Sequence, residues 1–279
     1  MGRRKTSLVT STGCTSFGEL ASYQLRNNDG NFVDEARDYD HFTRRLNQIR
    51  TTRQTGPTDV ANVSYSHDWA GNVTSVSDTV SSDTQCFRAE HLRRLTEAWT
   101  PNSGDCATDP TVAGLGGPSK YWQSYTYNVA GDRTKLVEHG TTAGDRTTEY
   151  FPTPGKHSIA KAVTTDNAGS RQALHSYDET GNTLTRPSPG GTTQTMTWDR
   201  EGRVATSTDE TGQSSYVYDA DGDRLIRRDP TGRTLYLPGQ ELRYATSSET
   251  KVHPLPHARG PGDRHARLDG LDLDVVRPA

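Results

Sequence analysis

The sequence is poor in the residues that fill a large hydrophobic core. Only 30% of its 279 residues are hydrophobic, whereas Thr, Asp, Arg and Gly are plentiful. This composition excludes a thick apolar core. It leaves either disorder or a thin repetitive architecture in which each strand pairs with its neighbours. The 12 Tyr and 4 Trp argue against disorder, because many of them recur in one local pattern.

Long apolar runs and an excess of one charge are also lacking. No stretch approaches the roughly 20 apolar residues of a membrane helix, so we expect no membrane span. The first five residues are basic, but residues 6–20 are polar, and we expect no signal peptide in this chain. The net charge is -3 with the two signs interleaved, which argues against nucleic acid as a partner.

Cysteine is scarce, and the three residues present are Cys14, Cys86 and Cys106. An odd number does not indicate a disulfide framework, and the absence of a CxxC pair argues against a zinc site. A bridge between Cys86 and Cys106 would close one loop around residues 92–105. Both states stay open at this point, because an exported chain favours the bridge and a cytoplasmic one favours free thiols.

One short pattern recurs along the chain. It consists of an aromatic or bulky residue, any residue, an aromatic residue or His, then Asp or Asn, and after two variable residues a Gly. The clearest copies are residues 65–76, 125–136, 175–186, 196–207 and 216–227. Weaker copies begin at Arg37 and Phe87, with Thr43 and Arg93 in the place of the Gly.

The chemistry of this unit predicts a β-hairpin. In the last copy, Tyr216 and Tyr218 share one face of a strand, because side chains alternate with period two. Asp219 opens a turn in which its carboxylate accepts from main-chain N–H groups ahead of it. Gly222 takes the fourth position, where Gly is favoured and a positive φ is often needed. The predicted turn residues are Asp68, Gly71, Asn128, Gly131, Asp178, Gly181, Asp199, Gly202, Asp219 and Gly222.

The repeats set the expected organisation of the chain. We expect an unstructured N-terminus over residues 1–14, a β region over 15–245, and an irregular or disordered tail over 246–279. Residues 101–118 are rich in Gly and Pro and predict a loop, and residues 141–170 predict an extended insertion between repeats. Residues 85–99 fit either a short helix or a strand, and the repeat frame favours a strand.

Three of these motifs resemble the signature of a known family. Residues 177–182 read Tyr-Asp-x-x-Gly-Asn, residues 218–223 read Tyr-Asp-x-x-Gly-Asp, and residues 198–203 carry a Trp variant. They resemble the YD-repeat, or Rhs (rearrangement hot spot), family over roughly residues 15–245. Residues 17–25 and 83–99 are similar to actinobacterial members of the wall-associated or polymorphic-toxin type.

That resemblance implies an all-β fold in which tandem hairpins form part of a spiral β-shell around a toxin domain. The implied partners are the remaining shell and the toxin domain, and the implied location is extracellular or cell-wall associated. The family's core motif and toxin domain are not recognisable after Tyr244, so we expect a partial shell. The resemblance also implies an alternative function, which is an extracellular carbohydrate-binding protein of the cell surface or cell wall.

The aspartates of the last copy suggest a calcium-binding loop, but the rest of the sequence argues against one. Asp219, Asp221 and Asp223 alternate as in a calcium loop. An EF-hand loop needs Gly at its sixth position and Glu at its twelfth, and here these are Arg224 and Pro230. Turn chemistry explains the aspartates without a metal, so we expect no metal and no cofactor.

Neither the histidines nor any catalytic motif in the sequence supports an enzymatic function. His253, His257 and His265 lie in the predicted tail, and His67 and His175 take aromatic positions of the repeat, where packing is the favoured role. The G-x-S-x-G, Walker A and HExxH motifs are absent, so we predict a protein that is not an enzyme. The candidates for stacking on sugars are Trp69, Trp99, Trp122 and Trp198. The alternative, which we favour, is that these rings pack between hairpins.

Overall fold

The computed structural model describes residues 9–27, 29–142, 144–188, 190–238, 240–245 and 251–254. These residues form antiparallel β-strands and one short 3-10 helix, which confirms the all-β prediction. Each strand pairs with its neighbours in sequence, so the chain is a long meander of hairpins. No helix in the described part of the chain is long and apolar enough to cross a membrane.

The strands fall into two sheets of 13 and 9 strands. The first sheet contains β1 (Val9–Cys14), β2 (Leu20–Arg26), β3 (Phe32–Tyr39), β4 (Leu46–Arg53), β5 (Asp59–His67), β6 (Val73–Asp78), β7 (Asp83–Ala89), β8 (Leu95–Trp99), β9 (Trp122–Tyr127), β10 (Arg133–Thr141), β11 (Gly144–Pro152), β12 (Ile159–Asp166) and β13 (Gly169–Leu174). The second contains β14 (Ser176–Tyr177), β15 (Thr183–Pro187), β16 (Thr193–Trp198), β17 (Val204–Asp209), β18 (Gly212–Tyr218), β19 (Arg224–Asp229), β20 (Gly232–Leu237), β21 (Gln240–Ala245) and β22 (Lys251–Pro254).

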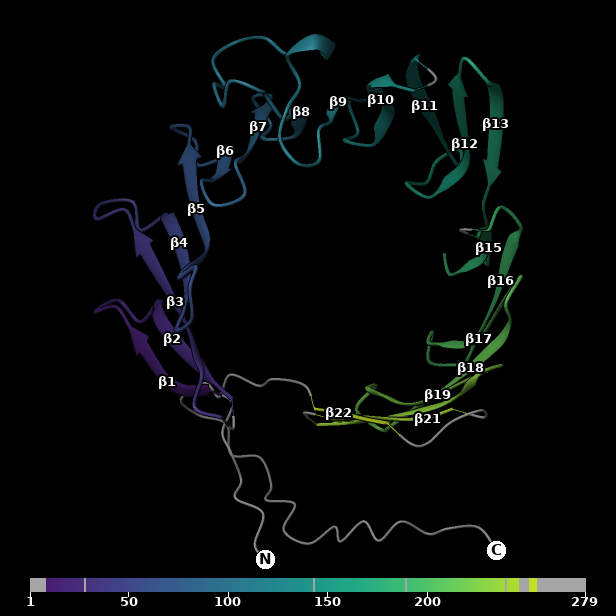
Figure 1. The fold of residues 1–279 in the computed structure, drawn as a ribbon. Helices are drawn as coiled ribbons and strands as arrows, with labels where there is room; N and C mark the ends of the chain where they lie inside the picture. The colour runs from purple at the N-terminus through teal and green to yellow at the C-terminus, as the bar shows by residue number, and fades with distance from the viewer. Residues whose placement is uncertain are drawn as a thin grey trace, which may run out of the picture.

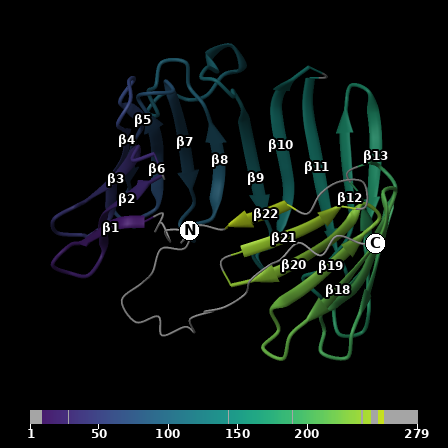
Figure 2. The same ribbon diagram turned by 60° about the horizontal axis from the view of Figure 1, so that its bottom comes forward.

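The strands curve into an open ring. Figure 1 shows the ribbon running from β1 at the lower left, over the top, and back to β22 at the bottom. Figure 2 shows the same strands standing side by side around the ring. The wall is one sheet thick, and the buried hydrophobic side chains of the described residues are few: Cys86, Ala98, Trp99 and Ala162. A thin wall of this kind is what a chain poor in apolar residues can build.

The two sheets join within one extended segment. The His175 N–H donates to the Ala160 carbonyl at 2.9 Å, which extends the pairing of β13 with β12 past the end of β13. The Tyr177 hydroxyl donates to the Ile159 carbonyl at 3.0 Å. The next residues, β14, pair on the other side with β15. The ribbon is therefore continuous from β1 to β22.

Both ends of the described chain depart from the sequence-based expectation. Val9–Cys14 lies in the segment predicted to be unstructured, but it forms β1 and pairs with β2. Lys251–Pro254 lies in the predicted irregular tail, but it forms β22 and pairs with β21. Strand pairing uses main-chain groups and needs no aromatic residue, which explains both corrections. The rest of the predicted tail, 246–250 and 255–279, lies outside the described residues, as do His257 and His265.

Three further segments of the predicted organisation have defined structures. Residues 85–99 form most of β7 together with β8, so the helical alternative is wrong. The predicted extended insertion, residues 141–170, contains β11 and β12. The loop between β8 and β9 holds the 3-10 helix η1 (Val112–Gly114) and lies outside the ring in Figure 1.

Candidate functional site

The turn at Asp178 shows how the recurring motif is built. The Asp178 N–H donates to the Asn182 carbonyl at 2.9 Å, and the Gly181 N–H donates to the Asp178 carbonyl at 3.1 Å. One carboxylate oxygen of Asp178 accepts from the N–H groups of Thr180 and Asn182, both at 2.9 Å. Hydrogen bonds from the Thr180 hydroxyl, the Asn182 amide and these main-chain groups lower the pKa of Asp178 to about 2.

The other clear copies share this geometry. Gly71, Gly131, Gly181, Gly202 and Gly222 have φ values of 92°, 93°, 92°, 74° and 92°. The side chains of Asp68, Asn128, Asp199 and Asp219 each accept from the N–H group four residues ahead, at 2.9 Å. Each acidic side chain is therefore bent onto its own main chain. Among the described residues, no group of three His, Cys, Asp or Glu side chains is arranged to hold a metal ion.

The weaker copies keep the turn without the glycine. Arg93 has a φ of 63° and donates its N–H to the Glu90 carbonyl at 2.8 Å. In the copy at Asp40, the residue with positive φ is Arg44, at 59°, and its N–H donates to the Asp40 carbonyl at 3.0 Å. The alignment that placed Thr43 at the glycine position was therefore wrong by one residue, because this turn contains one residue more.

The Tyr or Trp before five of the turns has a role that the sequence did not reveal. Its polar atom donates to the carbonyl of the first residue of a neighbouring strand. The pairs are Tyr39 to Leu20, Tyr127 to Leu95, Tyr177 to Ile159, Trp198 to Thr183 and Tyr218 to Val204, at 2.8–3.0 Å. The indole N–H of Trp198 replaces the phenol, which explains why the Trp variant fits the motif.

Turns that lie on the same edge of the ribbon are tied to one another. Every second connection of the meander lies on one edge, which we call the turn rim. It comprises residues 15–19, 40–45, 68–72, 90–94, 128–132, 153–158, 178–182, 199–203 and 219–223. Three arginines each donate to a carbonyl of the next turn on this rim. These bonds are Arg45 to Asp68 at 2.8 Å, Arg94 to Asn128 at 3.1 Å and Arg203 to Asp219 at 3.1 Å.

The four tryptophans have different environments. Trp99 is 1% exposed and cannot stack on a ligand. Trp122 donates to Glu97 at 2.8 Å and stacks on His139 with ring centroids 3.8 Å apart. Trp198 is half-buried and forms the hydrogen bond described above. Of the four, Trp69 alone is fully exposed.

A shallow groove adjoins the exposed indole. It measures about 390 Å³ and is lined by Asp40, Thr43, Arg45, Asn47, Tyr65, His67, Asp68 and Trp69. An aromatic ring beside acidic, amide and basic groups can stack on a sugar ring and bond its hydroxyls. Trp69 therefore combines an exposed indole with a groove lined by polar and charged groups.

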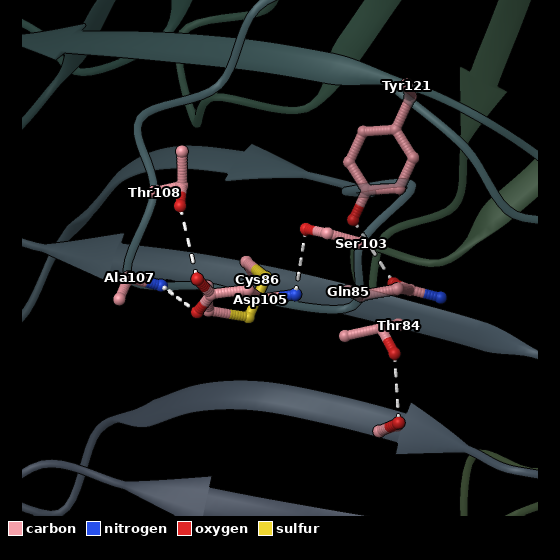
Figure 3. Close-up of a disulfide and its surroundings, with 10 residues drawn as sticks. Thr84, Gln85, Cys86, Ser103, Asp105, Ala107, Thr108 and Tyr121 are labelled. Carbon is pink, nitrogen blue, oxygen red and sulfur yellow. Dashed lines mark hydrogen bonds between the residues drawn. A yellow bond between two sulfur atoms is a disulfide. The ribbon is translucent and has the colours of Figure 1, made fainter. Parts of the chain in front are cut away.

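The two cysteines considered for a bridge, Cys86 and Cys106, form a disulfide. Cys86 of β7 is bonded to Cys106, with their Cα atoms 5.4 Å apart (Figure 3). The Tyr121 hydroxyl donates to the Gln85 amide oxygen at 3.1 Å near the other end of the same loop. These two links fix residues 100–121 to β7. Cys14 is exposed and has a free thiol.

A Ser–His–Asp series lies on β9 and the following hairpin. His139 Nε2 is 2.8 Å from Ser124 Oγ, and His139 Nδ1 is 3.0 Å from Asp145. Asp145 also accepts from the Gly140 N–H, and together with His139 this lowers the pKa of Asp145. Acyl transfer needs preorganised donors for the oxyanion as well. Ser124 is instead in the middle of a strand paired on both sides, so we assign the series a role in holding the hairpin.

Comparison with known proteins supports the repeat and the fold. Residues 198–234, which include the Trp198 and Tyr218 copies, match the RHS repeat family. The crystal structure of TcdB2-TccC3 is similar to this chain with a TM-score of 0.63 and 19% identity, over 88% of this chain and 13% of that chain. The Photorhabdus luminescens Tc holotoxin pore is similar with a TM-score of 0.61 and 21% identity, over 85% and 12%. No curated protein sequence matches.

These comparisons define the class of fold: an antiparallel strand ribbon of the type found in the Tc toxin shell. Within that class, the chain carries a segment of RHS repeats. At this identity the likeness to solved structures establishes the fold alone. The chain spans only 12–13% of the length of the solved chains that it resembles.

Proposed function

We propose that this chain is a non-catalytic structural segment of an RHS-repeat shell that encloses or displays a secreted toxin. The observation that carries the proposal is the curved ribbon of two sheets, β1 to β13 and β14 to β22, which are joined at His175 and Tyr177 and in which the repeated Asp and Gly build turns. The partners are further shell strands and a toxin domain. The location is extracellular or the cell wall, as part of a wall-associated or polymorphic-toxin protein of actinobacterial type.

The ribbon can continue at both of its ends. In the described part of the chain, the ribbon begins with the β1–β2 pair and ends with the β21–β22 pair. The edge strands of a sheet are where further strands add. The solved chains of similar fold are about eight times longer than this chain, and further shell strands would extend the ribbon.

Enclosure can be tested on the complete reading frame that contains this segment. The first step is to read the DNA after the codon for Lys251 in all frames; further Tyr-Asp units followed by a toxin domain are the expected result. The second step is protease treatment of the encoded protein. We expect the toxin domain to be protected, and Gly181→Val with Gly222→Val to expose it. Equal cleavage in both forms would contradict enclosure.

Carbohydrate binding is the second candidate function, and the exposed Trp69 beside its groove supports it. A glycan array together with titration of cell-wall sugars tests it. A ligand should quench the fluorescence of the wild type, and Trp69→Ala should abolish both binding and quenching. Trp122→Phe, which alters an indole already stacked on His139, is the matched control. The absence of binding on the glycan array, together with unchanged Trp fluorescence, would exclude carbohydrate binding.

A further inference from the structure

Five turns of the turn rim each present a large apolar side chain to solvent. These residues are Phe17, Phe42, Trp69, Leu92 and Val129, with exposed fractions of 72%, 90%, 103%, 59% and 106%. They belong to the first five turns of the rim, which join β1 to β2, β3 to β4, β5 to β6, β7 to β8 and β9 to β10. We call these five residues the apolar row.

The row ends where the later turns begin. The sixth turn has the sequence Thr153-Pro-Gly-Lys. The next turns read Glu-Thr, Arg-Glu and Ala-Asp between the Asp and the Gly, so none of them carries a large apolar residue at its tip. On the opposite edge, the two-residue tips that follow β17 and β19 are Glu-Thr and Pro-Thr. On that edge Val80 and Val112 are exposed at 44% and 50%, so exposed apolar residues also occur there, but the most exposed ones in the described turns lie on the first half of the turn rim.

The row has a regular spacing. Successive tips on one edge are two strands apart, which is about 10 Å, so the row is about 40 Å long. The first turns of the row project side by side at the left of Figure 1. Regular spacing lets the row match a second surface with the same repeat.

Two of the arginines at the turns of the row are already in ion pairs. Arg44 binds Glu19 and lies 4.4 Å from the ring centroid of Phe17. Arg94 pairs with Glu90 and also donates to Asn128. Covering a surface is costly when it leaves a charge unpaired. Covering these tips leaves these pairs intact, and the bonds between turns hold the tips in place beforehand.

We propose that the apolar row is a dimer interface and that its occupant is the same row of a second copy. A two-fold axis through the central turn, at Trp69, reverses the row onto itself and matches its curvature. Trp69 then faces the partner's Trp69, Phe42 faces the partner's Leu92, and Phe17 faces the partner's Val129. A larger side chain meets a smaller one on either side of the centre. The charged half of each rim lies away from this contact.

The exposed area is sufficient for such a dimer. An aromatic side chain presents about 150–250 Å², and the five residues of two copies together bury about 1,200 Å². That value is at the lower limit of specific, stable interfaces. The expected dimer is therefore reversible. The proposal concerns the isolated chain and does not depend on its role in a shell.

The first test is sedimentation equilibrium of the purified chain. The wild type should dimerise reversibly, and Trp69→Asp should raise the dissociation constant about 30-fold or more, as for a central interface residue. Val80→Asp is the matched control, because Val80 is an exposed apolar residue on the opposite edge of the ribbon. A wild type that stays monomeric overturns the proposal. So does association that Trp69→Asp leaves unchanged, which would indicate pairing of strand edges.

Symmetric crosslinking gives a second test that does not require a destabilising charge. In a Cys14→Ser background, Trp69→Cys should form a disulfide-linked dimer on mild oxidation, whereas Val80→Cys should not. Phe17→Cys and Val129→Cys should crosslink with each other when mixed. Crosslinking of the native Cys14 with failure of Trp69→Cys would show that β1 edges pair instead. Binding to phosphatidylcholine vesicles through Trp69 without dimerisation would indicate a lipid surface, and it too overturns the proposal.

Discussion

At the scale of the residue, one Asp or Asn side-chain oxygen and one positive φ define each clear copy of the turn. The Asp219 carboxylate accepts from two main-chain N–H groups that a tight turn would otherwise leave without a partner. The glycine supplies a conformation that a Cβ atom penalises. Both requirements act within five consecutive residues, so a sequence alone reveals them.

The turn geometry predicts opposite effects for substitutions at two equivalent positions. Gly181→Val should destabilise the chain by about 1–2 kcal/mol or more, since the cost is conformational and nothing lies within 4 Å of the added Cβ. Arg93→Gly should leave stability unchanged or raise it by up to about 1 kcal/mol, because it relieves a φ of 63° on an exposed residue. Thermal unfolding measures both, and a fall in the melting temperature of Arg93→Gly would contradict the model of the turn.

On the opposite edge, Glu210 predicts a pH dependence. Its carboxylate accepts hydrogen bonds from the hydroxyl groups of Ser188 and Thr192 and from the Gly190 N–H. The two hydroxyl groups contribute most to lowering the pKa of Glu210 from 4.5 to about 2. A lowered folded-state pKa stabilises the fold above the unfolded value and is lost as the pH falls through the folded one.

Glu210→Gln should therefore melt a few degrees below the wild type at pH 7. The difference should shrink below a pH of about 4.5 and vanish near 2, following the lowered pKa. Glu179→Gln, at an exposed turn tip, is the control and should melt as the wild type throughout. A difference that does not depend on pH would show that Glu210 contributes by packing rather than by charge.

At the scale of the element, five of the described repeats are held to a neighbouring strand by a hydrogen bond from an aromatic side chain. The phenol or indole reaches across the strand spacing to a carbonyl at the start of the neighbouring strand. The sequence shows that an aromatic residue recurs before the turn, but it does not show where its polar atom points. The acceptor belongs to a strand up to 32 residues away, as for Tyr127 and Leu95.

Tyr218→Phe removes one such bond. The Val204 carbonyl loses a donor at 3.0 Å, and the expected loss of stability is about 1 kcal/mol. Tyr216→Phe, on the same strand, is the control and should be close to neutral. Urea unfolding of the two variants measures the difference, and equal midpoints would show that the phenol acts through its ring alone.

At the scale of the whole molecule, the chain is a one-dimensional array. Strand types and hairpin turns follow from local patterns at Asp178, Asp199 and Asp219, and these were predictable. Strands β1 and β22 were missed because main-chain pairing leaves no side-chain signature. The favoured packing role is confirmed for Trp99, which is buried, but the sequence did not show which of the four tryptophans would be covered and which exposed. The ring shape results from the sum of the small twists between many neighbouring strands, and no single motif determines that sum.

The array predicts that damage stays local. Gly222→Val should lower the protection of amide hydrogens in β18 and β19, while β3 to β6 exchange as in the wild type, because each strand contacts only its neighbours. Hydrogen-exchange mass spectrometry resolves the two regions. Uniform loss of protection along the chain would show that the ring unfolds as a single cooperative unit.

The segment that contains His175 should be the place where the wall resists tension least. Its first part is bonded to the strand behind it and its last part to the strand ahead, so few lateral bonds cross the wall at this place. A load that pulls β12 away from β15 would be carried by the pairing of β14 with β15, the hydrogen bond from His175 to Ala160 and the phenol of Tyr177. Under tension, the ribbon should part here into two intact halves before any hairpin opens.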